Sequence, residues 1–369
     1  MSDDSQQPPA SFGTAPKGRL SAKDRKRSII LVVVGLVIAG FIFLVILPEV
    51  IDYEVVWETI KALSLAQLLI LIAAGLIYYI PEGWLYAAVM PGMSLWQGIK
   101  AWVASTGVGT TVPAVDLVAR FGMYRSWGHS IDASMRGIFL SGAFDWVVKF
   151  SLPVIAVIVL AIGGVEGLEF LTLIAVIAGA LLVLCVGVLV GLVRSERFTH
   201  WVAARVQKLA DWALAKLRRN SMVGLSDRVV FFRNDSVDIA RTRGVWAFVA
   251  SILGKLWQYV MLVMALRMVG LDDSILSLLE IFVVWAIVLL ITMIPITPGG
   301  IGIAELFYIG LFTQIAGEEY SSIIGAGVML YRLIQWAMPI PIGWAVFLRW
   351  KRKVDRGDLP DPFSLSTSG

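Results

Sequence analysis

The sequence is poor in charge, histidine and cysteine. Asp, Glu, Lys and Arg make up 16% of the 369 residues, whereas a soluble domain carries about 25%. A single cysteine, Cys185, excludes an internal disulfide and a thiolate metal site. There are only two histidines, and no metal or cofactor is expected. The chain lacks a Gly-x-x-x-x-Gly-Lys-Ser/Thr loop and a Gly-x-Ser-x-Gly hydrolase elbow. These absences argue against a soluble enzyme and against ATP-driven activity of this chain alone.

Apolar residues are correspondingly abundant. Hydrophobic residues make up 58% of the chain and the mean hydropathy is +0.81. This composition leaves too little polar surface to cover a water-soluble globule. The net charge of +4 does not indicate nucleic-acid binding, because membrane proteins concentrate Lys and Arg in their cytoplasmic loops. We therefore predict an all-α, polytopic membrane bundle.

Long apolar runs predict about eight crossings, since about 20 residues span a hydrocarbon core. The predicted spans are 29–47, 66–81, 134–162, 170–193, 245–269, 275–297, 300–317 and 321–348. The alternative for the first run is a signal peptide, but its apolar region is shorter, about 7–15 residues, and ends at small residues. Tyr79, Trp84 and Tyr86 near the end of the second run predict an interfacial aromatic belt.

Charged segments predict the domain organisation. Residues 1–28 form a polar tail, 29–348 a membrane domain and 349–369 a basic tail. The membrane domain divides into halves 29–193 and 244–348, and whether the two halves are related is left open. The linker 194–243 carries eleven Lys or Arg residues. Apolar residues at helical spacing over 201–219 predict an amphipathic helix on the cytoplasmic surface, with a coiled coil as the alternative. The positive-inside rule places both termini on the cytoplasmic side, in a bacterial inner membrane.

Two apolar segments, 107–120 and 295–305, are interrupted by proline and glycine. Such backbone survives at membrane depth only where protein buries it or where it lines a watery cavity. One broken segment in each half is a sequence pointer to a transporter site. We therefore expect one or two re-entrant or broken helices and include Pro113, Pro298, Gly299 and Gly300 in the candidate site. For Pro113 alone, a packing kink is the simpler explanation.

Ionisable residues inside apolar stretches supply the remaining candidates, because each costs roughly 2.5–3.5 kcal/mol to insert. They are Asp116, Arg120, Asp145, Lys149, Lys255, Glu280, Glu305 and Arg332. Either they line a polar pathway or they are ion pairs that hold helices together. The spacing of Asp145 and Lys149 allows a pair within one helix.

The stretch Thr297-Pro298-Gly299-Gly300-Ile301-Gly302-Ile303-Ala304-Glu305 resembles the hallmark of the lysylphosphatidylglycerol synthase transmembrane family, the flippase-like membrane domains of bacteria and archaea. Arg332, within Tyr331-Arg332-Leu333-Ile334, is similar to the arginine of the family's final helix.

The first half resembles the family more loosely. Pro113-Ala114 and Arg120 are similar to its Pro-Ala-Arg-x-Gly-Glu stretch and the arginine that follows, and Asp145 matches a later aspartate. Val115 replaces the first arginine, Asp116 stands in for the acid, and Gly142 stands where an arginine precedes the later aspartate.

The resemblance implies translocation of an anionic or zwitterionic lipid, either a phospholipid or a polyprenyl-phosphate-linked lipid. It implies a transporter rather than an enzyme, standing alone without the aminoacyl transferase domain of the best-known relatives. The basic candidates Arg120, Lys149, Lys255 and Arg332 would bind the lipid phosphate. The acidic candidates would bind a cationic headgroup, balance the bases or carry a coupling proton.

Two other functions stay open: a secondary transporter of a small organic anion and, less favoured, a membrane-embedded lipid transferase. For a protein partner, the candidates are a second copy of the chain and a lipid-biosynthetic enzyme.

Overall fold

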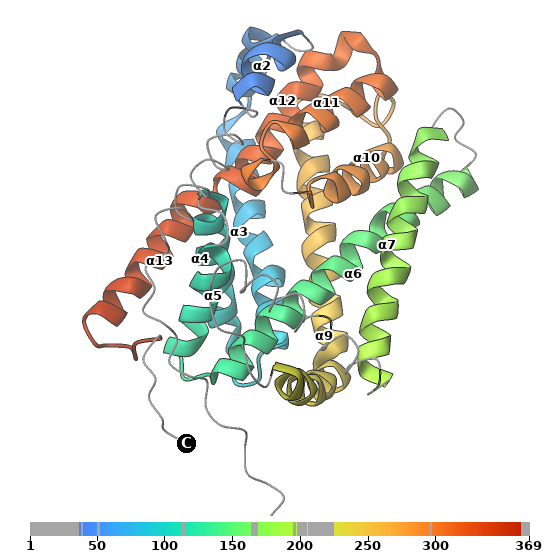
Figure 1. Ribbon diagram of the computed structural model, residues 1–369. Coiled ribbons are helices and arrows are strands. Elements are labelled where there is room, and N and C mark those ends of the chain that lie inside the picture. Colours follow the sequence, from blue (N-terminus) through green and yellow to red (C-terminus); the bar gives the residue numbers. More distant parts are fainter. Residues whose placement is uncertain are drawn as a thin grey trace, which may run out of the picture.

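A computed structural model describes residues 40–49, 52–111, 115–163, 169–194, 225–294 and 297–362, with the single positions 37, 197 and 205. Within these ranges every regular element is a helix, which confirms the all-α prediction (Figure 1). The predicted tail 1–28, most of the amphipathic segment 201–219, and Pro113 lie outside the described residues.

The helices differ widely in length. The short elements are η1 (Ile42–Ile46), η2 (Leu47–Glu49), η3 (Pro298–Gly300), η4 (Glu318–Tyr320) and η5 (Leu333–Ala337). The α-helices are α2 (Tyr53–Lys61), α3 (Leu65–Ala88), α4 (Leu95–Thr111), α5 (Val115–Ser126), α6 (Ile131–Gly163), α7 (Glu169–Arg194), α9 (Leu225–Met268), α10 (Leu278–Ile291), α11 (Ile303–Ala316), α12 (Ser321–Arg332) and α13 (Pro339–Asp355). In the described part, four helical stretches are long and apolar enough to cross a membrane: Leu65–Ala88, Ile131–Val159, Val237–Met268 and Glu318–Asp355.

Helix α3 corrects two predictions. The predicted span ends at Pro81, but the helix continues to Ala88 with that proline inside. Tyr79 and Tyr86 belong to the buried core and not to an aromatic belt, because they are 5% and 8% exposed. Membrane helices tolerate proline where neighbouring helices support the backbone. Here α4 lies directly against the helix, since a Cβ on Gly83 would clash with the backbone of Ile99.

Two predicted boundaries also shift. Helix α9 begins at Leu225, inside the predicted linker 194–243, and continues past residue 244 without a break. Helix α13 continues to Asp355, so the first residues of the predicted basic tail 349–369 extend the last helix. Both shifts place basic residues on helical extensions of apolar segments.

Both interrupted segments lie between packed helices. Helices α4 and α5 pack against each other on either side of residues 112–114, and α10 packs against α11 on either side of residues 292–302 (Figure 1). The turn η3, in the second interruption, contacts α4. The two helix–break–helix hairpins therefore meet, although they are about 190 residues apart in the sequence.

Small residues allow the helices around these hairpins to approach closely. A Cβ on Gly343 of α13 would clash with the carbonyl of Val103 on α4 and lie 2.8 Å from the Cα of Gly107. The Trp344 indole donates a hydrogen bond to Thr111 Oγ1, at 3.1 Å. Membrane helices pack through such small residues because lipid provides no hydrophobic force to press them together. Helix α13 is thereby fixed along α4, next to the first break.

Candidate substrate-binding site

A buried ammonium, Lys255 of α9, lies between α3 and α6. Its Nζ contacts Glu82 Oε1 of α3 at 2.7 Å and Asp145 Oδ1 of α6 at 2.8 Å. Lys149 approaches the other oxygen of Asp145, at 2.7 Å. A Cβ on Gly254 would lie 2.7 Å from Glu82 Oε1, so glycine leaves the space that this carboxylate occupies. Two carboxylates and two ammonium groups thus form a neutral cluster linking three helices.

A second ion pair holds the Pro-Gly-Gly turn. Arg332 Nε donates to Glu305 Oε1 at 2.7 Å, its Nη1 to Gln335 Oε1 at 3.0 Å and its Nη2 to the Gly299 carbonyl at 3.2 Å. The other oxygen of Glu305 accepts the Gly302 amide at 2.7 Å. Glu305 therefore caps the first turn of α11 and is also the counterion of Arg332. A buried fork of this kind fixes the turn against the last helices.

The turn itself requires glycine. Gly299, Gly300 and Gly302 adopt φ values of 63°, 70° and 81°, which side chains other than glycine rarely adopt. A Cβ on Gly299 would also clash with the indole nitrogen of Trp336. The arginine of the ion pair precedes a π-helical turn, η5, which re-aims the chain before α13.

The third group lies on α5, just after the first break. Arg120 Nη2 is 3.4 Å from Asp116 Oδ2, and its guanidinium lies 5.0 Å from the ring centroid of Tyr86. Its Nη1 donates weakly to Ser141 Oγ of α6, at 3.5 Å. The side chain is 12% exposed. Arg120 thus reaches from the first hairpin toward α3 and α6.

Two buried tyrosines each lie near more than one of these groups. The Tyr86 hydroxyl lies within electrostatic range of Arg120, Glu82 and Asp145. The Tyr331 hydroxyl lies within range of Lys255 and Arg332. We call the resulting row the polar line. Its members are Arg120, Tyr86, Glu82, Asp145, Lys149, Lys255, Tyr331, Arg332 and Glu305.

Both breaks also present buried donors that lack a partner among the described residues. They are Arg120 Nε, at the first hairpin, and Thr297 Oγ1 and Trp336 Nε1, at the Pro-Gly-Gly turn. Buried polar atoms are nearly always hydrogen-bonded, to protein or to water. Unpaired donors beside ion pairs therefore indicate a place where water or an acceptor-rich ligand completes the site.

The model of one protein family, described as the lysylphosphatidylglycerol synthase TM region, matches residues 31–343. The chain belongs to this family. The match spans every element of the polar line and both hairpins, and it confirms the resemblance carried by Thr297–Glu305. No curated protein matches the chain. Membership of this transmembrane family, together with the long apolar helices, makes the chain a multi-pass membrane protein.

Most of the predicted site residues come together in this family member. Arg120, Asp145, Lys149, Lys255, Glu305 and Arg332 lie on the polar line, with Asp116 paired to the first of them. Pro298, Gly299 and Gly300 form η3, whose Gly299 carbonyl accepts from Arg332.

Glu280 lies apart from the polar line. It lies in the first turn of α10, where its Oε2 accepts the Ser277 amide at 2.8 Å and the Ser277 hydroxyl at 2.7 Å. This is a capping box, in which the glutamate satisfies the amide that the first helical turn leaves free. The structure therefore shows a helix-capping contact for this residue.

Sequence reasoning missed Glu82, the tyrosines of the polar line, and the pair of Gln258 and Tyr78, in which the amide donates to the phenol. Glu82 follows Pro81, so it falls just beyond the predicted span and is not counted as a charge within the membrane. Counting it inside the span, as the continuous helix requires, would have placed a fourth ionisable group in the central cluster. Around the polar line and elsewhere in the described residues, no three His, Cys, Asp or Glu side chains gather to hold a metal ion.

Proposed function

We propose that the chain translocates an anionic or zwitterionic lipid, a phospholipid or a polyprenyl-phosphate-linked lipid, across the bacterial cytoplasmic membrane. The headgroup would move along the polar line while the hydrocarbon chains stay in the bilayer. The observation that carries this proposal is the set of unpaired buried donors at both breaks, each beside an arginine. Phosphate oxygens are the acceptors that an arginine and neighbouring N–H or O–H groups bind best.

The energetic role of the polar line follows from the cost of moving a headgroup through hydrocarbon. An ionic group without partners pays a large desolvation penalty in an apolar medium. The polar line offers both cations and anions along its length, so a phosphate can exchange hydration for an arginine or ammonium at each stage. Each cation already has a carboxylate partner at 2.7 to 3.4 Å. An arriving phosphate therefore replaces a carboxylate as the partner of the cation, and the cation is not left without a counterion before the phosphate arrives.

The carboxylates of the polar line have two proposed roles, which experiment can separate. They either receive the ammonium of a zwitterionic headgroup or take up the proton that balances an arriving anion. Lipid transport with no chemical change needs no catalytic group, so we propose a transporter rather than an enzyme.

Flipping of acyl-labelled phosphatidylglycerol and phosphatidylethanolamine in proteoliposomes tests the proposal. Glu305→Gln keeps the acceptor for the Gly302 amide and removes the counterion of Arg332. We expect the flipping rate to fall roughly tenfold or more, since a charged hydrogen bond contributes about 1.5–3 kcal/mol. Glu280→Gln is the matched control, because it alters another glutamate that accepts the N-cap amide of its helix, away from the polar line. It should leave the rate unchanged.

Two results would contradict the proposal. Equal rates for protein-containing and empty liposomes with every lipid tested would exclude flipping of those lipids. Uptake of a water-soluble anion such as glycerol 3-phosphate, without lipid flipping, would instead support a small-anion transporter.

A further inference from the structure

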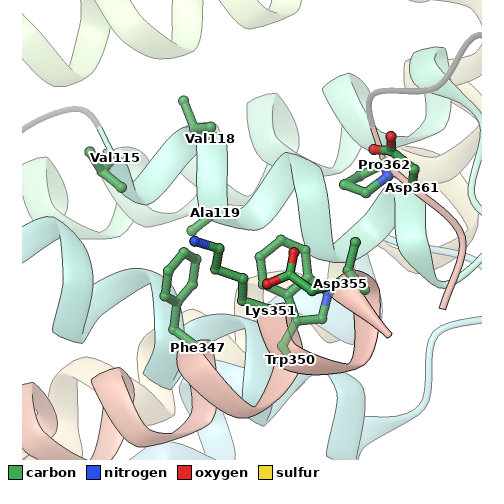
Figure 2. A pocket seen from close by; sticks show the side chains of 10 residues that line it. Val115, Val118, Ala119, Phe347, Trp350, Lys351, Asp355, Asp361 and Pro362 are labelled. Atoms are coloured by element: carbon green, nitrogen blue, oxygen red, sulfur yellow. The ribbon is translucent and has the colours of Figure 1, made fainter. Parts of the chain in front are cut away.

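Helix α5 has two different faces. On one face, Val118 and Ala119 line a pocket between α5 and α13 (Figure 2). The other face carries Asp116, Arg120 and Tyr124, which are spaced four residues apart and therefore lie one above the other along the helix. We call these three side chains the α5 row. It includes the buried arginine of the first break and a tyrosine that lies one helical turn further into the protein.

Contacts with α6 place Arg120 and Tyr124 side by side. Arg120 Nη1 lies 3.5 Å from Ser141 Oγ, and a Cβ on Gly137 would lie 3.6 Å from Cε2 of the Tyr124 ring. Gly137 and Ser141 are also four residues apart on their helix, so the two helices match turn for turn. The hydroxyls of Tyr86 and Tyr124 both lie within electrostatic range of Arg120. The guanidinium and the Tyr124 hydroxyl therefore face the same small region between α3, α5 and α6.

Two donors of the α5 row have no partner among the described residues: Arg120 Nε and the Tyr124 hydroxyl. Tyr124 is 0% exposed, so bulk solvent does not reach its hydroxyl. The neighbouring Tyr86 hydroxyl has Ser105 as its hydrogen-bond partner. Because buried polar atoms are nearly always hydrogen-bonded, an acceptor is missing beside the guanidinium and the phenol.

The α5 row becomes more buried from one end to the other. The side chain of Asp116 is 36% exposed and that of Arg120 is 12% exposed, whereas Tyr124 is fully buried. Asp116 lies 3.4 Å from Arg120, which is longer than the 2.7 Å between Glu305 and Arg332. An anion that arrives beside Asp116 can therefore replace this carboxylate without breaking a short ion pair.

We propose that Arg120 and Tyr124 together bind one phosphate group, which makes Tyr124 a phosphate-binding residue. Arg120 Nε donates to one phosphate oxygen, and the Tyr124 hydroxyl donates to another oxygen of the same group. Phosphate fits because it offers several acceptor oxygens and a negative charge to an arginine and a neighbouring hydroxyl. The contact is with the phosphate itself and not with the group esterified to it.

This inference deepens the proposed function and rests on it in taking the phosphate to belong to a lipid. Binding is measured without transport, so the two proposals can fail separately. If flipping fails while phospholipid binding depends on Tyr124, the phosphate site stands and translocation is wrong. If flipping is observed and Tyr124→Phe does not change binding, only the phosphate site is wrong.

Native mass spectrometry of the full chain in detergent tests the assignment, with titrations of phosphatidylglycerol, phosphatidylethanolamine and diacylglycerol that carry identical acyl chains. Tyr124→Phe should weaken the binding of both phospholipids about tenfold and by the same factor, the scale of a hydrogen bond to a charged group. Binding of diacylglycerol, which has no phosphate, should not change.

Tyr79→Phe is the matched control. It removes another buried phenol hydroxyl that lacks a partner among the described residues. The Tyr79 ring packs against Trp102, with 5.4 Å between ring centroids, and not between α5 and α6. This variant should bind all three lipids like the unmodified chain.

Unfolding of the lipid-free variants by sodium dodecyl sulfate separates a binding role from a structural one. The Tyr124 hydroxyl makes no hydrogen bond to the described residues, so its removal should leave the stability unchanged or higher. A titration with glycerol 3-phosphate identifies the source of the phosphate. Binding of this soluble ester that depends on Tyr124 would assign the site to a free phosphate ester, whereas dependence for the phospholipids alone assigns it to a lipid.

Three outcomes would overturn the assignment. The first is unchanged binding of phospholipids and of glycerol 3-phosphate by Tyr124→Phe, which would show that water completes the site. The second is a loss for only one of the two phospholipids, which would indicate a contact with the group esterified to the phosphate. The third is a lower stability of lipid-free Tyr124→Phe, which would show that the hydroxyl bonds to the protein.

Discussion

Replacing Lys255 by methionine removes the cation that one buried carboxylate, Glu82, shares with the partly buried Asp145. The ammonium lies 2.7 Å from Glu82 and 2.8 Å from Asp145. Asp145 keeps Lys149 as a partner at 2.7 Å, whereas the described residues offer Glu82 no second ion pair. Glu82 is 5% exposed. Lys255→Met therefore leaves one buried carboxylate without a counterion, and methionine fills nearly the same space.

The expected destabilisation is about 3–5 kcal/mol, the cost of leaving one partner of a buried pair uncompensated. In the double variant Glu82→Gln/Lys255→Met, both charges disappear and the pair of Asp145 and Lys149 remains. We expect it to recover roughly 2 kcal/mol of that loss, within the range of coupling energies between contacting residues. Asp273→Asn is the control for an exposed pair, with Arg267, and should cost at most about 1 kcal/mol.

The free energy of unfolding can be measured by titrating the purified protein in mixed micelles with sodium dodecyl sulfate. The 14 tryptophans provide the fluorescence signal. Two results would refute the reasoning. One is Lys255→Met unfolding at the same detergent fraction as the unmodified protein. The other is a double variant no more stable than Lys255→Met alone.

Three further predictions concern the glycine contacts and the buried arginine. Gly299→Ala should lower the free energy of unfolding by about 1–3 kcal/mol, because the φ of residue 299 is positive and the added Cβ would clash with the Trp336 indole. The control Gly310→Ala, whose Cβ has free space, should not lower it. Equal stabilities of the two variants would contradict this reasoning. Gly343→Ala should lower the free energy of unfolding by about 1–3 kcal/mol, because the added Cβ pushes α13 away from α4. Gly142→Ala, whose Cβ would have nothing within 4 Å, should leave it unchanged. Equal thermal unfolding of the two variants would count against the close contact of α13 with α4. Arg332→Lys should slow lipid flipping roughly tenfold, because lysine cannot donate to three acceptors arranged for a fork; an unchanged rate would argue against the arginine's role.

Much of the architecture follows from apolar length alone. The runs 134–162 and 170–193 predict α6 and α7 to within three residues, because long apolar stretches flanked by polar residues have few alternatives. The interrupted segments are recognisable for the opposite reason. Proline and glycine within an apolar run predict a break, and both breaks lie between packed helices.

The errors arise where local rules yield to packing. A proline at position 81 predicts the end of a helix, but the glycine contact with α4 allows α3 to continue. That error hides Glu82 and misassigns Tyr79 and Tyr86, because a residue beyond a predicted span is taken as interfacial. The partner of a buried charge also cannot be read from one sequence. Lys255 pairs with a residue 173 positions away, and only the fold brings the two together.

Glu280 shows that a charge within an apolar stretch does not by itself identify a site residue. A lone carboxylate in an apolar stretch predicts a site residue, but the serine three positions earlier predicts a capping box equally well. Glu305 occupies the same position of its own helix, but it follows a glycine in place of the serine and pairs with Arg332. The distinction between the two glutamates depends on a contact between helices.

The most direct test of lipid translocation is a density map of the protein in nanodiscs made from native lipids. The account predicts an ordered headgroup between the two breaks, with its phosphate within hydrogen-bond distance of Arg120 or Arg332 and its chains reaching the bilayer. A dry interior, in which the donors at both breaks bond only to protein and no lipid density enters the polar line, would contradict it.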